Sequence, residues 1–367
     1  MRASFYIFKH LNGRRRVCWK FFLYAALLLQ CAVVTSATSV VASPIRRVIV
    51  SGGTHGNEYT GVYVLEKLKS QSEILKQNYP SLEIETLLAN PKAHAANRRF
   101  IDDDLNRMFA ESMLSDISLS SYEANRAKAI SFAIGPKGSK AAADFCVDLH
   151  TTTACMGCTI IVNEWCPLSI RAAAYISRRW SDACAQDGAV AIGSEGCGVR
   201  HDFRVMLHPG GSQAEAPYLC SVARNGLTIE IGPIPQGLLR SDVIASTERA
   251  LQLVLEFLEL LNNGEPVELP HSLRVYIDRG KVPWEAGHDG SKLPGAVVHH
   301  SLQDRDFGVL SRGDPLYQRV DGSVLAYDGS CGEIVHPVFV NEAAYYYAES
   351  GQGVTMTQCV EWKLPSS

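Results

Sequence analysis

Long blocks of one charge are absent from this chain of 367 residues, whose formal net charge is −3 at pH 7. Without an excess of basic residues, general binding to nucleic acid is not expected. Internal repeats and low-complexity segments are absent as well. Because 46% of the residues are hydrophobic, the chain has ample material for the core of a globular protein.

The cysteines do not form the compact pattern of a disulfide-rich domain. Cys18 and Cys31 precede the main body, and the remaining nine form an odd set scattered through apparent strands and helices: positions 146, 155, 158, 166, 184, 197, 220, 331 and 359. This usage favours the cytoplasm. Cys155-x-x-Cys158 has no second Cys pair beside it, so we expect buried free thiols rather than a redox pair or a second zinc site.

The amino terminus suggests a different compartment from the one that the cysteines favour. Arg14-Arg15-Arg16 precedes the apolar run Phe21 to Val34, and small residues follow around Ala37 and Ala42. This layout is typical of a secretory signal or a membrane anchor, and it leaves membrane association through residues 17–42 open. The alternative is a mispredicted leader on a cytosolic body, so the compartment stays open between the two.

Two short polar motifs supply the residues of a metal site. Gly52 to Glu58 reads Gly-Gly-Thr-His-Gly-Asn-Glu, and Asp148-Leu149-His150 follows about ninety residues later. Two imidazoles and one carboxylate with a fourth position left to water are a ligand set of catalytic zinc. We therefore predict that His55, Glu58 and His150 bind one zinc ion.

The context of these motifs predicts an α/β fold. Arg46 to Ser51 and Asp144 to His150 are apolar runs typical of buried parallel strands, and Gly61 to Ser70 has helical spacing. The metal ligands would then lie at strand ends, where open α/β sheets place their sites.

The sequence pattern changes from helical to strand-like near residue 264, which indicates a domain boundary. The amphipathic stretch Ser246 to Leu261 ends at Asn262-Asn263-Gly264-Glu265-Pro266, and short β-branched or aromatic runs separated by turns follow between Leu273 and Val360. We therefore divide the chain into a leader (residues 1–45), a metal-binding domain (46–264) and a smaller β-rich domain (265–367).

Two further carboxylates are placed to serve such a site. Asp148, two residues before His150 on the same strand face, could fix the tautomer of an imidazole or could cap the following turn. Glu230 ends the apolar strand Leu227-Thr228-Ile229. Because a buried glutamate with a purely structural role would need a buried cation, we interpret Glu230 as the general base.

The chain resembles the aspartoacylase and type-III aminoacylase group. The shared motifs, in this order, are 52–58, Asn90-Pro91, 101–107 (Ile-Asp-Asp-Asp-Leu-Asn-Arg), 148–150, 230–233 (Glu-Ile-Gly-Pro) and 337–346. This group belongs to the succinylglutamate desuccinylase branch of zinc carboxypeptidase-like hydrolases. The resemblance implies a mixed sheet flanked by helices, a carboxy-terminal β-rich domain that closes over the active site, and a cytoplasmic location.

The resemblance also implies roles for single residues. Glu230 matches the family's general base, and Arg99 would polarise the scissile carbonyl and stabilise the oxyanion. Asn106 and Arg107 would hold the α-carboxylate of the substrate, and Tyr345 would close over that carboxylate. The site would then lie between the two domains.

One departure from the family pattern bears on the substrate. Aspartoacylases have an arginine ten residues before the catalytic glutamate, where this chain has Cys220, and a tyrosine four residues earlier, where it has Ala216. An apolar, roomier pocket favours aromatic or S-conjugated side chains, as in type-III aminoacylases. Arg200 or Arg204, expected in a Gly-rich loop, could replace the missing cation.

The sequence therefore predicts a zinc-dependent amidohydrolase that deacylates small-molecule N-acyl-L-amino acids, with N-acetyl aromatic amino acids and S-conjugated N-acetylcysteines preferred. The first alternative is an aspartoacylase that acts on N-acetylaspartate. A non-catalytic binding module on the same fold is a further alternative, and a homo-oligomer stays open.

Overall fold

The computed structural model describes residues 44–186, 202–285, 287, 293–346 and 353–364, with the side chains of 181–186 left out. The predicted leader (1–45), apart from its last two residues, and Arg200 lie outside these ranges. Within them, no helix is long and apolar enough to cross a membrane.

Cys155 is disulfide-bonded, whereas Cys158 is a buried free thiol. The expectation of two free thiols is therefore wrong for Cys155.

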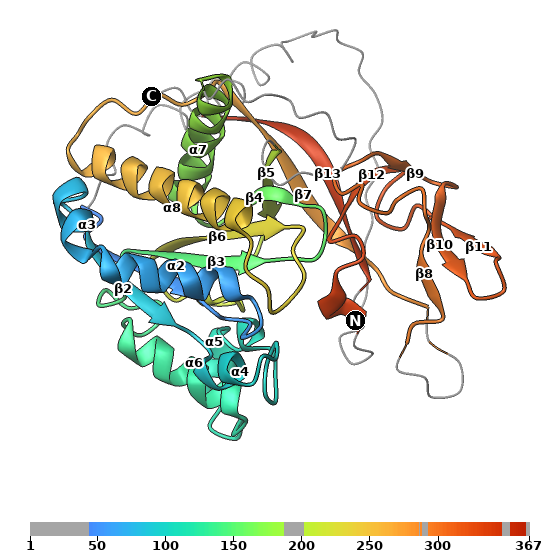
Figure 1. Cartoon of the computed structure of the whole chain (residues 1–367), viewed down its shortest axis with the longest axis horizontal. Coiled ribbons are helices and arrows are strands. Elements are labelled where there is room, and N and C mark those ends of the chain that lie inside the picture. The colour runs from blue at the N-terminus through green and yellow to red at the C-terminus, as the bar shows by residue number, and fades with distance from the viewer. Residues whose placement is uncertain (1–43, 187–201, 286, 288–292, 347–352, 365–367) are drawn as a thin grey trace, which may run out of the picture. The chain divides into compact units, whose positions relative to one another are not determined.

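A ten-stranded mixed sheet forms the centre of the molecule (Figure 1). Its strands, in spatial order, are β2 (Glu83–Leu88), β1 (Arg47–Gly52), β3 (Phe145–Thr151), β6 (Asn225–Gly232), β4 (Gly157–Asn163), β5 (Phe203–His208), β7 (Ser272–Val282), β13 (Val354–Lys363), β12 (Ile334–Val338) and β9 (Leu310–Ser311). Strands β2, β1, β3 and β6 are parallel, and β4 pairs antiparallel with β6. The expected α/β fold with a mixed sheet is confirmed.

Helices cover both faces of the sheet (Figure 1). The α-helices are α2 (Tyr59–Ser70), α3 (Ser72–Asn78), α4 (Pro91–Ala95), α5 (Glu111–Ser115), α6 (Tyr122–Ala133), α7 (Pro167–Gln186) and α8 (Ser241–Asn262). The short 3-10 helices are η1 (Leu105–Arg107), η2 (Leu219–Ser221) and η3 (Ala343–Tyr346). Apolar residues of α2, α7 and α8 share one core with one face of the sheet, and α6, η1 and η2 pack against the opposite face.

Side-chain alternation along β3 and β6 places polar residues on the face of the sheet opposite α2 and α8. On β3, Val147 and Leu149 enter the core beneath α2 and α8, so Asp148 and His150 point the other way. On β6 the same alternation sends Leu227, Ile229 and Ile231 into that core. Thr228 and Glu230 therefore face the side on which Asp148 and His150 lie.

The carboxy-terminal part of the chain is rich in strands, as the sequence indicates. A three-stranded sheet of β11 (Val324–Ala326), β10 (Pro315–Arg319) and β8 (Ala296–Val298) has a core of its own with β9, β12 and β13. The boundary proposed at residues 262–266 falls at the end of α8. The large sheet continues across it, because β7 pairs parallel with β5 and antiparallel with β13.

Candidate functional site

The turn between β1 and α2 brings two of the predicted metal ligands together. Gly56 allows the turn to lie against α4, because a Cβ atom there would come within 2.2 Å of the Ala93 carbonyl carbon. The Gly56 N–H also donates to the Arg99 carbonyl at 3.0 Å. This close approach holds His55 and Glu58 on one side of the turn and brings Arg99 near them.

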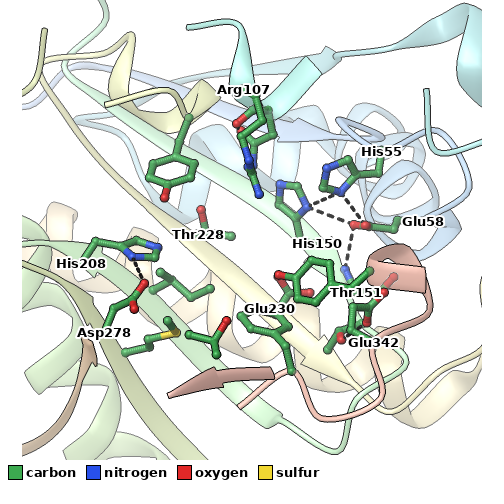
Figure 2. A pocket seen from close by; sticks show the side chains of 18 of the residues that line it. His55, Glu58, Arg107, His150, Thr151, His208, Thr228, Glu230, Asp278 and Glu342 are labelled. Carbon is green, nitrogen blue, oxygen red and sulfur yellow. Dashed lines mark hydrogen bonds and ion pairs between the residues drawn. The ribbon is translucent and has the colours of Figure 1, made fainter. Parts of the chain in front are cut away.

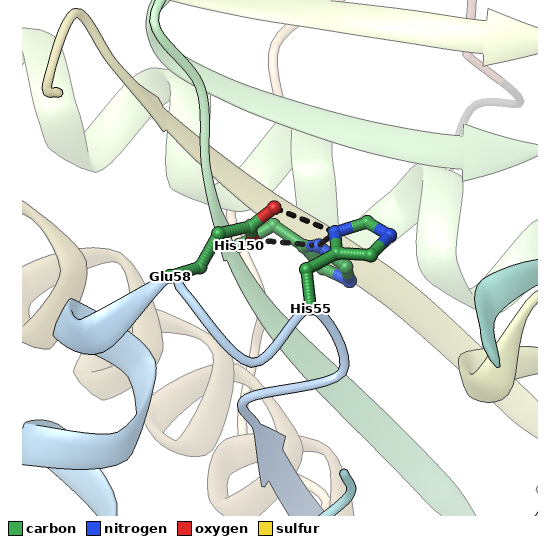
Figure 3. Close-up of side chains that lie close together, drawn as sticks. All are labelled: His55, Glu58 and His150. Carbon is green, nitrogen blue, oxygen red and sulfur yellow. Dashed lines mark hydrogen bonds and ion pairs between the residues drawn. The ribbon is translucent and has the colours of Figure 1, made fainter. Parts of the chain in front are cut away.

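The third ligand arrives from β3 (Figure 3). His55 Nδ1 lies 2.5 Å from Glu58 Oε1, His150 Nδ1 lies 3.0 Å from Glu58 Oε2, and the two Nδ1 atoms are 3.1 Å apart. All three side chains are almost fully buried. Ligand atoms about 2.1 Å from a tetrahedral zinc ion are separated by roughly 3.4 Å. The three separations here are shorter, so the ligand atoms would move apart by up to roughly 1 Å to hold the ion.

A carboxylate holds the far nitrogen of each imidazole. Asp148 Oδ2 lies 2.8 Å from His150 Nε2, and Thr54 Oγ1 donates to the other Asp148 oxygen at 2.8 Å. Asp104 Oδ1 lies 3.1 Å from His55 Nε2. When each Nε2–H donates to its carboxylate, both Nδ1 lone pairs converge beside the Glu58 carboxylate. Three such acceptors with no proton between them form a cation site, and this donor set suits zinc.

The local electrostatic field favours positive charge. Burial raises the pKa of the Glu58 carboxyl, but His55 and His150 outweigh this effect and hold the pKa well below its usual range. Burial lowers the pKa of His150, but Asp148 and Glu58 raise it well above its usual range. The same negative potential that holds a proton at this position would hold a metal cation.

Glu230 lies on the strand next to His150, beside the triad of His55, Glu58 and His150. The β3–β6 register pairs His150 with Glu230, and both residues line one pocket (Figure 2). Burial, together with Glu58 and Glu342, raises the pKa of Glu230 well above its usual range, although His150 and Arg99 act in the opposite direction. A carboxylate of raised basicity is suited to accept and return a proton.

The basic residues expected to bind substrate line the same pocket. Arg99 donates to Asp104 at 3.2 Å. Burial lowers the pKa of Arg99, but the negative charges of Asp104 and Glu58 raise it above its usual range. Asn106 accepts the Leu219 N–H at 2.9 Å, which leaves its NH2 group to donate to a ligand. The Arg107 guanidinium lies over the Tyr218 ring, 5.6 Å from its centroid.

Tyr345 enters the pocket from η3 and is buried. Burial raises the pKa of its hydroxyl, which therefore stays a neutral hydrogen-bond donor. Glu342, three residues earlier, accepts the Thr153 N–H at 2.8 Å and contacts Thr152 Oγ1. These contacts attach the segment that carries Tyr345 to the end of β3, next to the metal ligands.

The expected specificity residues lie in different places. Cys220 lines the pocket, and burial raises the pKa of its thiol to about 12, so the wall there is uncharged. Ala216 does not line the pocket, and its carbonyl accepts from the Lys137 ammonium at 2.6 Å. Arg204 is on β5 rather than in a loop, pairs with Asp202 at 3.6 Å, and lies outside the lining.

Several residues at the site were not identified from the sequence: Asp104, which contacts His55 and Arg99, and the pocket-lining Glu342. Asp104 and Glu342 fall inside the shared motifs, so a search for second carboxylates near each ligand could have found them. His208, Asp278 and Lys281 also line the pocket. They come from β5 and β7, whose motif-free sequences gave no signal before the strand pairing was known.

Comparisons with known proteins agree with this geometry. The succinylglutamate desuccinylase/aspartoacylase catalytic domain matches residues 44–258, and the AstE/AspA barrel-sandwich hybrid domain matches residues 275–357. The human N-acyl-aromatic-L-amino acid amidohydrolase (carboxylate-forming) is 36% identical over 89% of this chain and 95% of its own. The aspartoacylase of Xenopus tropicalis is 36% identical over 87% of this chain and 94% of its own.

Among solved structures, murine aminoacylase 3 superimposes with a TM-score of 0.75 at 34% identity, covering 88% of this chain and 98% of that one. The two family domains match both the part that contains the candidate site and the β-rich part. The chain therefore belongs to the succinylglutamate desuccinylase/aspartoacylase family, and it is an amide-hydrolysing enzyme.

Proposed function

We propose that the protein is a zinc-dependent amidohydrolase that cleaves N-acyl-L-amino acids into a carboxylate and a free amino acid. The observation that carries the proposal is the convergence of His55 Nδ1, Glu58 and His150 Nδ1, with Asp104 and Asp148 behind the two imidazoles. The relatives named amidohydrolase, aspartoacylase and aminoacylase support the reaction class.

The residues around the triad divide the work of amide hydrolysis. His55, Glu58 and His150 would hold zinc, which would supply an activated water and polarise the acyl carbonyl. Glu230 accepts the proton of the water and delivers it to the leaving amine. Arg99, held by Asp104, donates to the oxygen that becomes negative in the transition state. Glu342 helps to raise the pKa of Glu230, which makes Glu230 a stronger base for this proton transfer.

The substrate would be held by its α-carboxylate. Arg107 offers two parallel N–H donors, Asn106 offers its amide NH2, and Tyr345 offers its hydroxyl. Since all three line the pocket that contains Glu230, a carboxylate bound there would bring the neighbouring N-acyl group to the triad. The domain division follows from the same placement: residues 46–264 would supply the chemistry, and 265–367 would supply Tyr345 as a cover.

The preferred amino acids would have aromatic or S-conjugated side chains. Cys220 presents a neutral thiol where aspartoacylases have an arginine, and Ile161 and Met206 line the same pocket. A side-chain carboxylate would enter this region without the partner that its desolvation demands.

Hydrolysis of N-acetylaspartate is the second candidate, because Lys281 also lines the pocket. Its ammonium lies 5.0 Å from the centroid of the Tyr345 ring. A cation at this position could accompany Arg107 and bind a second carboxylate. The relatives named aspartoacylase are as similar to this chain as the amidohydrolase is.

The test is turnover by the zinc-loaded protein of N-acetylaspartate, N-acetyl aromatic amino acids and S-benzyl-N-acetylcysteine. We expect kcat/KM for the last two classes to exceed that for N-acetylaspartate by orders of magnitude. Arg107→Ala should weaken the binding of every substrate, since all share the α-carboxylate. No turnover of any substrate by the zinc-loaded wild type would overturn the proposal.

A further inference from the structure

A polar pair lies at the end of the pocket away from the metal ligands. His208 on β5 and Asp278 on β7 both line the pocket, and His208 Nδ1 is 3.2 Å from Asp278 Oδ2. Figure 2 shows this pair across the pocket from His55 and Glu58. The mechanism of amide hydrolysis described above does not use either residue.

The His208 ring is held on a second side by an aromatic wall. It stacks on Tyr218, with the ring centroids 5.1 Å apart and the planes 16° from parallel. The Arg107 guanidinium lies 5.6 Å from the centroid of the same Tyr218 ring. Tyr218 thus contacts both Arg107, the proposed partner of the α-carboxylate, and His208.

The hydrogen bonds of Asp278 determine which nitrogen of His208 carries the proton. Burial raises the pKa of Asp278, but hydrogen bonds from His208 and from the Gly280 N–H outweigh it and lower the pKa. Asp278 is therefore a carboxylate, which can only accept hydrogen bonds. It follows that His208 Nδ1–H donates to Asp278. With its single proton on Nδ1, the ring presents Nε2 as a hydrogen-bond acceptor.

No hydrogen bond to His208 Nε2 is formed within the described part of the chain. The walls that adjoin this end include uncharged side chains from neighbouring strands, among them Ile161 and Met206. An aromatic ring lying between these apolar walls would meet polar groups at its far end, where Asn163 on β4 is the strand neighbour of His208. Because the His208 acceptor loses water on binding, it needs a donor in return.

We propose that His208 is a specificity-determining residue whose Nε2 accepts a hydrogen bond from the far end of the substrate's aromatic side chain. The enzyme then selects N-acyl amino acids whose ring bears a donor, such as the phenol O–H of tyrosine, over those with a plain or halogenated phenyl ring. Asp278 is a positioning residue that fixes the tautomer. This inference rests on the proposed function.

The test compares two substrates of nearly equal size, N-acetyl-L-tyrosine and N-acetyl-4-fluoro-L-phenylalanine, with the zinc-loaded protein. Only the first can donate to His208. One hydrogen bond to an acceptor backed by a charged group changes kcat/KM by about tenfold or more. We expect the wild type to prefer the tyrosine substrate by at least that factor.

Two variants separate recognition from a structural role. His208→Phe keeps a ring on Tyr218 but removes the acceptor, so kcat/KM should fall for the tyrosine substrate and not for the fluorinated one. Asp278→Asn can donate to Nδ1, which moves the ring proton to Nε2 and turns the acceptor into a donor, so the ratio should also fall. The matched control is Arg204→Met on the same strand, outside the pocket lining, for which the ratio should not change.

A wild-type ratio near one would overturn the inference and leave the proposed function intact. An equal loss for both substrates in His208→Phe and in Asp278→Asn would show that the pair only joins β5 to β7, and this result would overturn it too. Absence of turnover for both substrates and for the wider panel would instead refute the proposed function, and the inference with it.

Discussion

Replacing Cys220 by arginine is the sharpest test of substrate preference. The side chain is 2% exposed and lines the pocket, and Thr228 Oγ1 lies 3.8 Å from its sulfur. Because burial keeps the thiol neutral, the wild type offers no charge here to a carboxylate on the substrate. Cys220→Arg would introduce a planar guanidinium able to bind one bidentately.

The expected magnitude follows from the cost of an unpaired charge. Hydrogen bonds between charged groups contribute about 1.5–3 kcal/mol each, which corresponds to roughly 10- to 150-fold in a ratio of kcat/KM. We therefore expect Cys220→Arg to shift the preference toward N-acetylaspartate, relative to N-acetylphenylalanine, by a factor in this range. The gain should lie at the lower end, because Ala216 is outside the lining and cannot support the guanidinium.

The assay measures kcat/KM for both substrates in the wild type, Cys220→Arg and Cys220→Met, all loaded with zinc. Cys220→Met adds length without charge, so it should not favour N-acetylaspartate. A folded, zinc-loaded Cys220→Arg with an unchanged ratio would refute the reasoning, and so would a wild type that already hydrolyses N-acetylaspartate best.

Three further predictions concern the metal, the base and the pH dependence of stability. His55→Ala or His150→Ala should lose zinc and activity while the core stays folded, and stoichiometric zinc by elemental analysis in either variant would contradict the ligand assignment. Glu230→Gln should lower kcat by roughly a hundredfold to ten-thousandfold with zinc retained, so near wild-type turnover would exclude a general base. Burial raises the pKa of Asp306 to about 7, although backbone N–H donors oppose this effect, so the folded state binds more protons than the unfolded state between about pH 4 and 7. The free energy of unfolding should therefore fall more steeply as the pH rises through this window in the wild type than in Asp306→Asn. If denaturation curves show the same change in this free energy between pH 5 and 8 in both proteins, the assignment is refuted.

The sequence predicted the parts of the fold that depend on local patterns. The apolar run before Gly52 is β1, the helical spacing after Gly61 lies in α2, and the amphipathic stretch before Asn262 is the end of α8. Each signal is contained in a short stretch of consecutive residues, where periodicity or an apolar run identifies the element. The continuation of the large sheet through β7 and β13 was not predicted, because strand pairing between distant segments leaves no such local signal.

The same distinction explains what was found of the candidate site. His55 and Glu58 share one turn, and His150 ends a recognisable strand, so their residue types and positions indicated a metal site. Asp104 was part of a quoted motif but had no role until its oxygen was seen 3.1 Å from His55 Nε2. The disulfide at Cys155 was missed because an odd, scattered set of cysteines does not reveal which of them come together.

Substrate preference is the property that a single motif position determines least. The exchange of arginine for Cys220 removes one cation from the wall, yet Lys281 reaches the same pocket from β7, about fifty residues beyond the catalytic motif. Whether Lys281 replaces the lost charge depends on where a second carboxylate would lie relative to Arg107. If it does, Lys281→Met should lower kcat/KM for N-acetylaspartate and spare N-acetylphenylalanine. If Lys281 only borders the pocket, the variant should change both substrates equally, and the neutral wall at Cys220 alone would account for an aromatic preference.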